Sequence, residues 1–229
     1  MIDFVINQLK CSKTVNKIII ATTTLSEDDK IINLLGQRKI EFFCGSENDV
    51  LTRYYECAKF HSLDVIVRIT SDCPLIDPEI IDDLVQKFLN SDCDFISPGF
   101  PRTYPQGSAD IEVFSFQSLE KMWLEAKKPS EKEHVSPYIV NNSNLFKLGN
   151  IENDENQSDI RLTVDHKIDF DLIQIIIEHF KECKYFSMEQ LVLFLNKNPQ
   201  LKEMNSNISH YEGYLKSLKE DKIYLKSLK

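Results

Sequence analysis

Two aspartates that follow apolar runs have the residue type and position needed to bind a metal ion. Asp72 lies within RITSDCPLIDP, just after the predicted strand DVIVRIT (64–70), and Asp165 ends the predicted strand IRLTVD (160–165). A carboxylate directly after a buried strand can point into a site without a long flexible stem. Mg²⁺ takes one or two carboxylates and completes its coordination with water and phosphate oxygens. The pattern is therefore compatible with metal-assisted chemistry on a phosphate chain.

Both aspartates also have structural explanations, which the sequence leaves open. Asp72 or Ser71 could close a turn ahead of Pro74. Asp165 could cap the helical pattern KIDFDLIQIIIEHF (167–180). Taken one at a time, these explanations are favoured. The two acids lie more than 90 positions apart, so they form one site only if the fold brings them together.

Three cations and a histidine are further candidates for substrate contacts. Arg68 lies within a predicted strand and needs a partner there, because an unpaired buried charge is costly. It could hold either aspartate in place or contact a phosphate, and structural pairing is favoured. His134 could contact the substrate, although a single histidine on a helix more often just packs. Arg102 and Lys132 are solvated cations by default and could bind an anion.

The segment SPGFPRTYPQGSAD (97–110) contains three prolines and two glycines, which predicts a loop or a lid. Tyr104, Gln106 and Gly107 lie in this loop, where a sugar could be recognised. Polar loops are common, so composition alone gives this assignment little weight.

The elements that must position these residues alternate in type over the first hundred residues. Predicted strands alternate with predicted helices, at 17–23, 26–39, 40–45, 47–61, 64–70, 77–91 and 94–98. This alternation predicts parallel strands with right-handed crossovers, and hence an α/β sandwich. Ligands of such sheets bind beyond the carboxyl ends of the strands. The turns that follow residues 23, 45 and 70 should therefore lie on one rim.

The composition limits the classes of partner. The formal net charge is −9, which argues against a nucleic-acid polymer or an anionic membrane as the main partner. No apolar run approaches the roughly 20 residues that span a bilayer. The six cysteines are scattered without metal-binding spacing, which favours reduced thiols and a cytoplasmic location.

Five segments together carry a resemblance to a known family. They are GSENDVLTRYYECAK, RITSDCPLIDPEIID, EVFSFQSLEKM, EHVSPYI and RLTVDHKIDF. In this order they resemble the spore-coat polysaccharide (SpsF-like) branch of the sugar-acid cytidylyltransferases, whose relatives include CMP-KDO synthetases and acylneuraminate cytidylyltransferases. The resemblance runs over nearly the whole chain. It implies a three-layer α/β/α sandwich of the nucleotide-diphospho-sugar transferase type, with a mostly parallel central sheet.

The resemblance also implies a reaction and its residues. A hydroxyl of a sugar, expected to be a nonulosonic-type sugar acid, would attack the α-phosphate of CTP in the presence of Mg²⁺. The products would be pyrophosphate and a CMP-sugar for cell-surface or spore-coat polysaccharide. Asp72 and Asp165 match the family's metal-binding acids. Arg68 and Ser71 would line the nucleotide side, and the loop 102–110 the sugar side.

The start of the chain departs from the family pattern. The family begins with a strand and a glycine- and arginine-containing loop, ending near a lysine, that wraps the triphosphate. MIDFVINQL (1–9) resembles the helix after that loop. We therefore expect a sheet without its first strand, a chain truncated at its N-terminus, and no productive binding of CTP by the chain as written.

The sequence leaves two alternative functions open, and it also predicts the limits of the domains. A non-catalytic sugar-binding or scaffold homologue is one alternative. A glycosyltransferase is another, and it ranks lower because the relevant turn reads SDCP rather than Asp-x-Asp. We expect an α/β domain over 1–200 and a helical tail over 201–229, read as one or two exposed amphipathic turns. A homodimer is expected by analogy.

Overall fold

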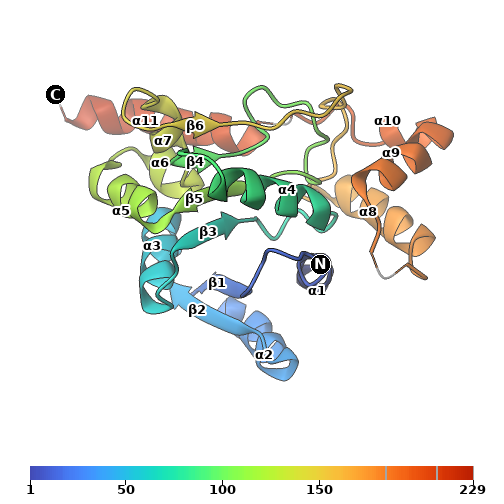
Figure 1. Cartoon of the computed structure of the whole chain (residues 1–229), viewed down its shortest axis with the longest axis horizontal. Coiled ribbons are helices and arrows are strands. Elements are labelled where there is room, and N and C mark those ends of the chain that lie inside the picture. The colour runs from blue at the N-terminus through green and yellow to red at the C-terminus, as the bar shows by residue number, and fades with distance from the viewer. Residues whose placement is uncertain (184, 210, 229) are drawn as a thin grey trace.

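The computed structural model describes residues 1–183, 185–209 and 211–228, and its first hundred residues alternate between strands and helices (Figure 1). In chain order these elements are α1 (Ile2–Leu9), β1 (Ile19–Thr23), the 3₁₀ turn η1 (Ser26–Asp28), α2 (Asp29–Arg38), β2 (Glu41–Gly45), α3 (Val50–Phe60), β3 (Val65–Arg68), α4 (Pro78–Leu89) and β4 (Phe95–Ile96). The predicted alternation is confirmed, and most elements are a few residues shorter than their sequence patterns.

The rest of the chain is mainly helical. Its elements are β5 (Glu112–Ser115), α5 (Phe116–Glu125), α6 (Pro129–His134), α7 (Pro137–Asn141), β6 (Leu148–Gly149), α8 (Lys167–His179), α9 (Met188–Lys197), α10 (Pro199–Glu203) and α11 (Glu212–Ser227). The predicted helix at 130–142 is interrupted just before Pro137, as expected. The segment 97–110 is a loop, also as expected.

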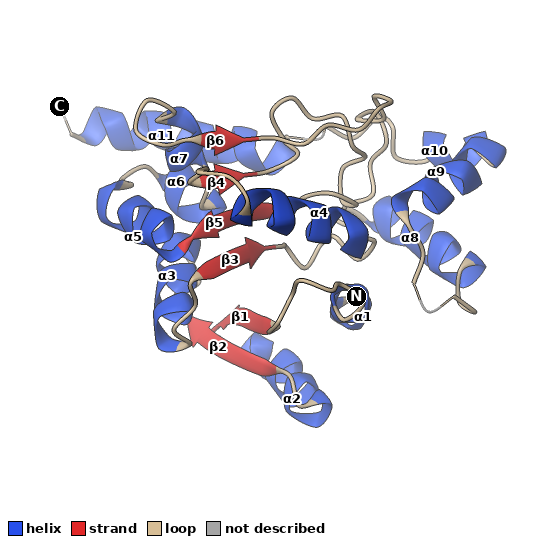
Figure 2. Cartoon of the chain, in the orientation of Figure 1, coloured by secondary structure: helices blue, strands red, loops and turns tan. Residues whose placement is uncertain are grey.

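The described strands form two hydrogen-bonded sheets. β1 and β2 pair in parallel, with Ile19 opposite Glu41. The other sheet has the order β3-β5-β4-β6, in which β5 is antiparallel to β3 and β4, and β4 is parallel to β6. β3, β4 and β6 therefore run in one direction. Figure 2 shows β1 and β2 standing apart from the other strands, with helices packed around both sheets. The α/β class with parallel strands is confirmed, and the sheet is divided between β1 and β3.

The start of α4 shows how a local signal positions distant elements. Asp77 precedes the helix and Pro78 is its first residue, as predicted. One Asp77 carboxylate oxygen accepts the N–H of Glu79 at 2.8 Å, and the other accepts the N–H of Met188 at 2.6 Å. Burial raises the pKa of this carboxyl. Asp77 thus caps α4 and also ties it to the first turn of α9.

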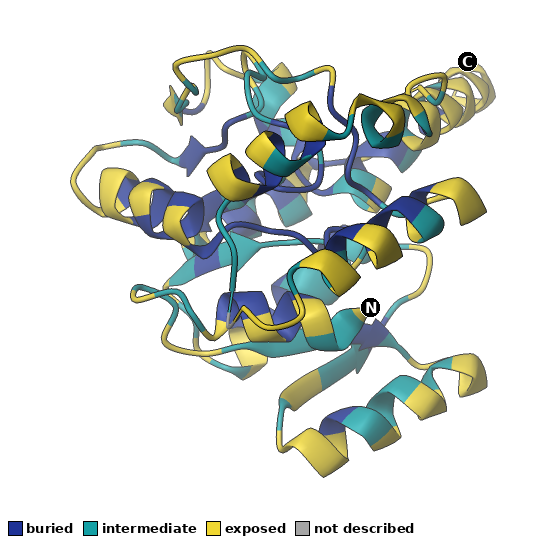
Figure 3. Ribbon diagram, turned by 90° about the vertical axis from the view of Figure 1, so that its right-hand side faces the viewer, coloured by how far each residue is buried: buried dark blue, intermediate teal, exposed yellow. Residues whose placement is uncertain are grey.

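The apolar interior consists of two clusters. One joins the inner face of α4 to α8 and α9, through residues such as Ile81, Leu84 and Ile173. The other packs α3 and α5 against β4 and β5, around Phe95 and Phe114. Figure 3 shows the same division on most helices, with buried residues on one side and exposed residues on the other. This packing fixes the strand ends and turns on which the candidate residues lie.

Two expectations about single segments are wrong. The run 160–165 is no strand; its one ladder contact is an isolated bridge between Gln106 and Arg161. The tail is more than one or two exposed turns, because α11 is sixteen residues long and packs against α6. In the part of the chain that the structure describes, every helix is too short or too polar to cross a membrane.

Candidate active site

Asp72 lies in the turn between β3 and α4, and the fold joins this turn to the segment that carries Asp165. The N–H of Val164 donates to the backbone carbonyl of Asp72 at 2.9 Å. The two aspartates therefore lie on adjacent segments. The half-buried Asp72 carboxylate has only one hydrogen-bonding partner among the described residues, the Cys73 thiol, whose sulfur lies 3.7 Å away. Since this is a weak donor, the carboxylate is available to a cation.

Asp165 is less available than Asp72. One of its carboxylate oxygens accepts a hydrogen bond from Nη2 of Arg161 at 2.5 Å. Half of the Asp165 side chain is exposed, and its second oxygen has no partner in the described part of the protein. Asp165 does not cap α8, because that helix begins after His166 and is closed by Asp169 at its third position. One oxygen thus remains for a ligand, and the other is held by an ion pair.

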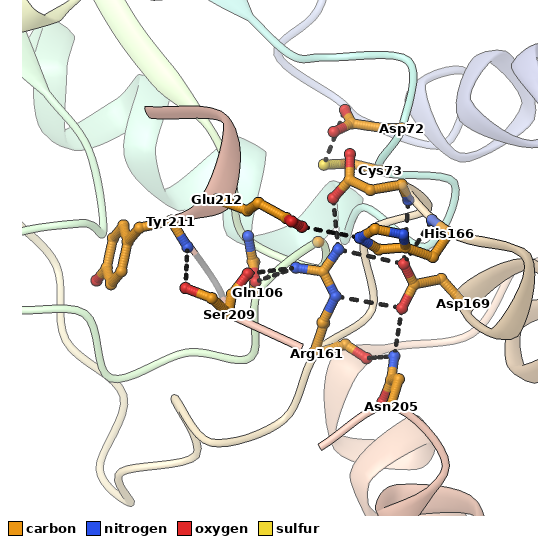
Figure 4. A network of polar contacts seen from close by, with 12 residues as sticks. Asp72, Cys73, Gln106, Arg161, His166, Asp169, Asn205, Ser209, Tyr211 and Glu212 are labelled. Carbon is orange, nitrogen blue, oxygen red and sulfur yellow. Dashed lines mark hydrogen bonds and ion pairs between the residues drawn. The ribbon is translucent and has the colours of Figure 1, made fainter. Parts of the chain in front are cut away.

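A buried ionic network is centred on Asp169, which Figure 4 shows between Arg161 and Asn205. Asp169 has a fully buried side chain and pairs with Nε and Nη2 of Arg161, each at 3.2 Å. Asn205 donates to Asp169 at 2.7 Å, and so do the backbone N–H groups of Asp165 and His166. Burial acts to raise the pKa of Asp169, but the hydrogen bonds from Arg161 and Asn205 lower it overall. The network fixes the backbone that presents Asp165.

The loop 102–110 folds around an acid that the sequence did not single out. Asp110 accepts two hydrogen bonds from Arg102, at 2.7 and 3.2 Å, and one from the N–H of Gly107. Gly107 has a φ of +89°, and a Cβ there would lie 2.5 Å from the backbone carbon of Leu162. Only glycine fits this close approach. Tyr104 lies in the same loop and donates to the carbonyl of Glu152 at 3.4 Å.

Gln106 connects this loop to the network around Asp165. Its backbone exchanges hydrogen bonds with the 160–162 segment, from its N–H to Ile160 at 2.9 Å and from Leu162 to its carbonyl at 2.8 Å. Its side-chain oxygen accepts from Arg161 at 3.3 Å (Figure 4). The sugar-side loop of the sequence analysis and the segment before Asp165 are therefore neighbours.

Arg68 is directed to a partner other than the two aspartates. Its Nη1 donates to Glu112 at 2.8 Å, and these two residues lie opposite each other in the β3–β5 ladder. The guanidinium also lies over the Tyr54 ring, 5.5 Å from its centroid. Burial would lower the pKa of Arg68, but the Glu112 carboxylate raises it. The structural pairing favoured by the sequence is the one observed, and Glu112 is its partner.

His134, Lys132 and Ser71 complete the set of candidates. Nε2 of His134 lies 3.0 Å from Oγ of Ser217 on α11, and burial lowers the pKa of this histidine. Nζ of Lys132 pairs with Asp49 at 2.8 Å. Ser71 is exposed in the turn next to Asp72. His134 and Lys132 thus have structural partners of their own, whereas Ser71 lies beside the candidate site.

The fold therefore brings three segments together: the turn at Asp72, the segment before Asp165 and the loop around Asp110. The Cys73 thiol lies close to both Asp110 and Asp72. Burial raises the pKa of this thiol well above its usual value, and the charges of the two aspartates raise it further. Within the described ranges no group of three or more histidine, cysteine or acidic side chains could by itself hold a metal ion. The arrangement suits a cation shared between one or two carboxylates and a substrate.

Asp110 and Glu112 are the two acids that sequence reasoning missed. The signal that could have found Asp110 is the arginine eight positions before it in a loop rich in proline and glycine. The signal for Glu112 was weaker. It is an acid within a predicted strand, and such an acid can neutralise an arginine in a neighbouring strand. Finding it required knowing that β5 pairs with β3.

Matches to known proteins cover most of the chain. A family model described as Cytidylyltransferase matches residues 1–211. The uncharacterized protein MJ1063 of Methanocaldococcus jannaschii is 41% identical over 91% of this chain and 84% of its own length. The spore coat polysaccharide biosynthesis protein SpsF of Bacillus subtilis is 26% identical over 87% of this chain and 84% of its own length.

Solved structures extend the comparison. A cytidylyltransferase of Leptospira borgpetersenii superposes with a TM-score of 0.85 at 36% identity, covering 91% of this chain and 87% of that one. A CMP:2-keto-3-deoxy-manno-octonic acid synthetase complexed with CTP has a TM-score of 0.56 at 13% identity, over 78% of this chain and 87% of that one, and shares the fold. The match over residues 1–211 and these identities lead to one conclusion: the chain belongs to the cytidylyltransferase family.

Proposed function

We propose that this chain serves the transfer of CMP from CTP to a sugar acid of the nonulosonic type. A sugar hydroxyl oxygen bonds to the α-phosphorus of CTP, the bond from that phosphorus to the bridging oxygen breaks, and pyrophosphate leaves. The hydroxyl proton passes to solvent. The observation that supports the proposal is the hydrogen bond between Val164 and Asp72, because two sequence-distant acids then lie on adjacent segments. The product would feed synthesis of a surface polysaccharide, as the name of the Bacillus subtilis relative suggests.

The residues present fit a magnesium ion that is shared with the substrate. Among the described residues, the Asp72 carboxylate has only a thiol for a partner, and one Asp165 oxygen has none. Mg²⁺ needs no more than one or two protein carboxylates when phosphate oxygens and water complete its octahedron. When bound, the ion would neutralise charge that develops on the α-phosphate and on the leaving pyrophosphate.

The other residues of the site would orient the reactants. The loop 102–110 is held in one conformation by the Arg102–Asp110 pair and by Gly107, so it can present fixed polar groups to a sugar. Asp169 pairs with Arg161 and accepts a hydrogen bond from the backbone N–H of Asp165, so it would fix the backbone conformation at Asp165. Positioning of this kind supplies much of the rate in phosphoryl-type transfer.

A second candidate function is sugar binding without turnover, and one observation favours it. The three arginines near the site, Arg68, Arg102 and Arg161, each already pair with a carboxylate of the protein. A triphosphate needs cations that are free to meet it. If these pairs persist, residues 1–229 would bind a sugar acid but hold CTP too weakly for catalysis.

Pyrophosphate release from CTP, measured with a panel of sugar acids and Mg²⁺, tests the proposal. In a chain that also carries the family's N-terminal strand and phosphate-binding loop ahead of Met1, we expect release that depends on all three components, and a loss of roughly 10²-fold or more in Asp72→Ala. Asp92→Ala is the matched control, because Asp92 is exposed and pairs with Lys147 on the surface. Full activity in Asp72→Ala would contradict the assignment of Asp72. Calorimetric binding of a sugar acid without turnover would instead establish the second candidate function.

A further inference from the structure

A pocket of about 820 Å³ lies at the start of α11 and reaches the residue that follows Asp165. That residue, His166, forms part of its wall, and the segment 207–209 and the first turns of α11 form the rest. We call this space the α11 pocket. Its volume falls within the range of about 300–1,000 Å³ that is usual for small-molecule sites.

Arg161 connects the α11 pocket to the candidate active site. Its Nη1 lies 3.3 Å from the side-chain oxygen of Gln106 and 3.5 Å from the backbone carbonyl oxygen of Ser209, which lines the pocket (Figure 4). Its Nη2 pairs with Asp165. The pocket therefore adjoins both the loop 102–110 and the second proposed metal-binding acid.

Two lysines of α11 line the pocket. Lys216 and Lys219 are three positions apart, so they lie on neighbouring parts of one helix face. Both are exposed, and in the described part of the chain neither side chain has an ion pair or a hydrogen bond. Arg161, by contrast, is neutralised by two aspartates. The lysines can therefore meet an anionic ligand without first breaking an ion pair.

The rest of the lining suits a sugar better than a phosphate chain. Glu212 lies in the wall, with its carboxylate 2.9 Å from Nε2 of His166. A carboxylate accepts hydrogen bonds from sugar hydroxyl groups, whereas it repels the several negative charges of a polyphosphate. The segment 207–209 adds an amide and a hydroxyl group, and together with Leu215 it adds apolar surface.

We propose that the α11 pocket binds the carboxylate end of a sugar acid, with Lys216 and Lys219 as its cations and Glu212 as an acceptor for sugar hydroxyl groups. The choice of a sugar acid rests on the proposed function, which this assignment deepens. α11 begins at Glu212, beyond the residues 1–211 that the family model matches, so membership of the family does not assign this role.

Calorimetric titration of the 229-residue chain with sugar acids tests the inference. The probes are N-acetylneuraminate and 3-deoxy-manno-octulosonate, each compared with its neutral methyl ester. We expect the double variant Lys216→Gln, Lys219→Gln to bind the acids roughly 10–100-fold more weakly, because charge-assisted hydrogen bonds are lost. The parent should bind the esters as weakly. Lys222→Gln is the matched control, because Lys222 is exposed on the same helix and does not line the pocket.

Three results would overturn the inference. They are equal affinity of the parent and the double variant for the acids, no binding of either acid by the parent, and pyrophosphate that binds through the same lysines more tightly than the acids do. Failure of the proposed reaction gives a different result, because the titrations contain no CTP. In that case the extended chain releases no pyrophosphate, while the double variant still loses affinity for the sugar acid.

Discussion

Asp169 is a buried residue that holds the backbone leading into Asp165. Its buried carboxylate accepts hydrogen bonds from Arg161, Asn205 and two backbone N–H groups that lead into Asp165. Asp169→Ala leaves the Arg161 guanidinium buried and only partly paired, which typically costs about 3–5 kcal/mol. We expect the free energy of unfolding, measured by urea titration, to fall by about that amount.

Asp171→Ala on the same helix is the control for this prediction. Asp171 is 38% exposed and pairs with Lys167 on the surface. Exposed pairs of this kind contribute about 0.3–0.5 kcal/mol. If the free energy of unfolding falls by the same amount in both variants, the ionic network around Asp169 does not stabilise the segment that carries Asp165.

Single residues were predictable where their surroundings in the sequence defined their role. Asp72 and Asp165 follow apolar runs, and the structure places them on neighbouring segments. Asp77 precedes a proline and a helical pattern, and it caps α4. Asp110 and Glu112 were missed because their partners, Arg102 and Arg68, are known only once the loop and the β3–β5 ladder have formed.

Among the elements, α11 docks in an unusual way, through polar side chains. Asp221 is buried and accepts hydrogen bonds from the N–H and hydroxyl of Ser130 on α6, at 2.9 and 2.6 Å. Ser217 is buried beside it and donates to Glu133 at 2.6 Å. The helix keeps Leu215 and Ile223 largely exposed. The positions of the apolar residues therefore do not show which face of α11 is covered.

Removing the Asp221 carboxylate should release α11 from α6. Asp221→Ala leaves the buried N–H and hydroxyl of Ser130 without acceptors, at a cost of about 1–3 kcal/mol. We expect faster amide exchange throughout 212–227 and earlier cleavage there by a protease, with the core unchanged. Glu220→Ala is the control, because Glu220 is exposed on the same helix. Equal exchange rates in the two variants would show that other contacts hold the helix.

For the whole molecule, the order of strands and helices follows from the sequence, whereas the division of the sheet does not. Periodicity identifies the strand at 17–23 and the strand at 64–70 separately. It carries no information on whether their edges meet. That depends on what lies between them, and here it is a cavity rather than a hydrogen-bonded ladder.

The stability of the whole chain should fall on acidification below about pH 4. Burial acts to raise the pKa values of Asp82 and Asp169, but their hydrogen bonds lower both overall. A carboxyl whose folded pKa lies below its unfolded value of about 3.9 stabilises fully above that value, and the stabilisation is lost as pH falls through the folded pKa. Asp77 has the opposite sign, because burial raises its pKa, so it offsets part of the loss.

Thermal unfolding between pH 7 and pH 2.5 measures this dependence, and Asp82→Asn isolates one contribution. Asp82 accepts hydrogen bonds from Ser12, Lys13 and Thr14, and so ties α4 to the segment between α1 and β1. The variant should have a lower Tm than the parent at pH 7 and should lose less Tm between pH 4 and pH 2.5, so the two curves converge. Curves that stay parallel down to pH 2.5 would mean that the Asp82 carboxylate has the same pKa in the folded and unfolded chains.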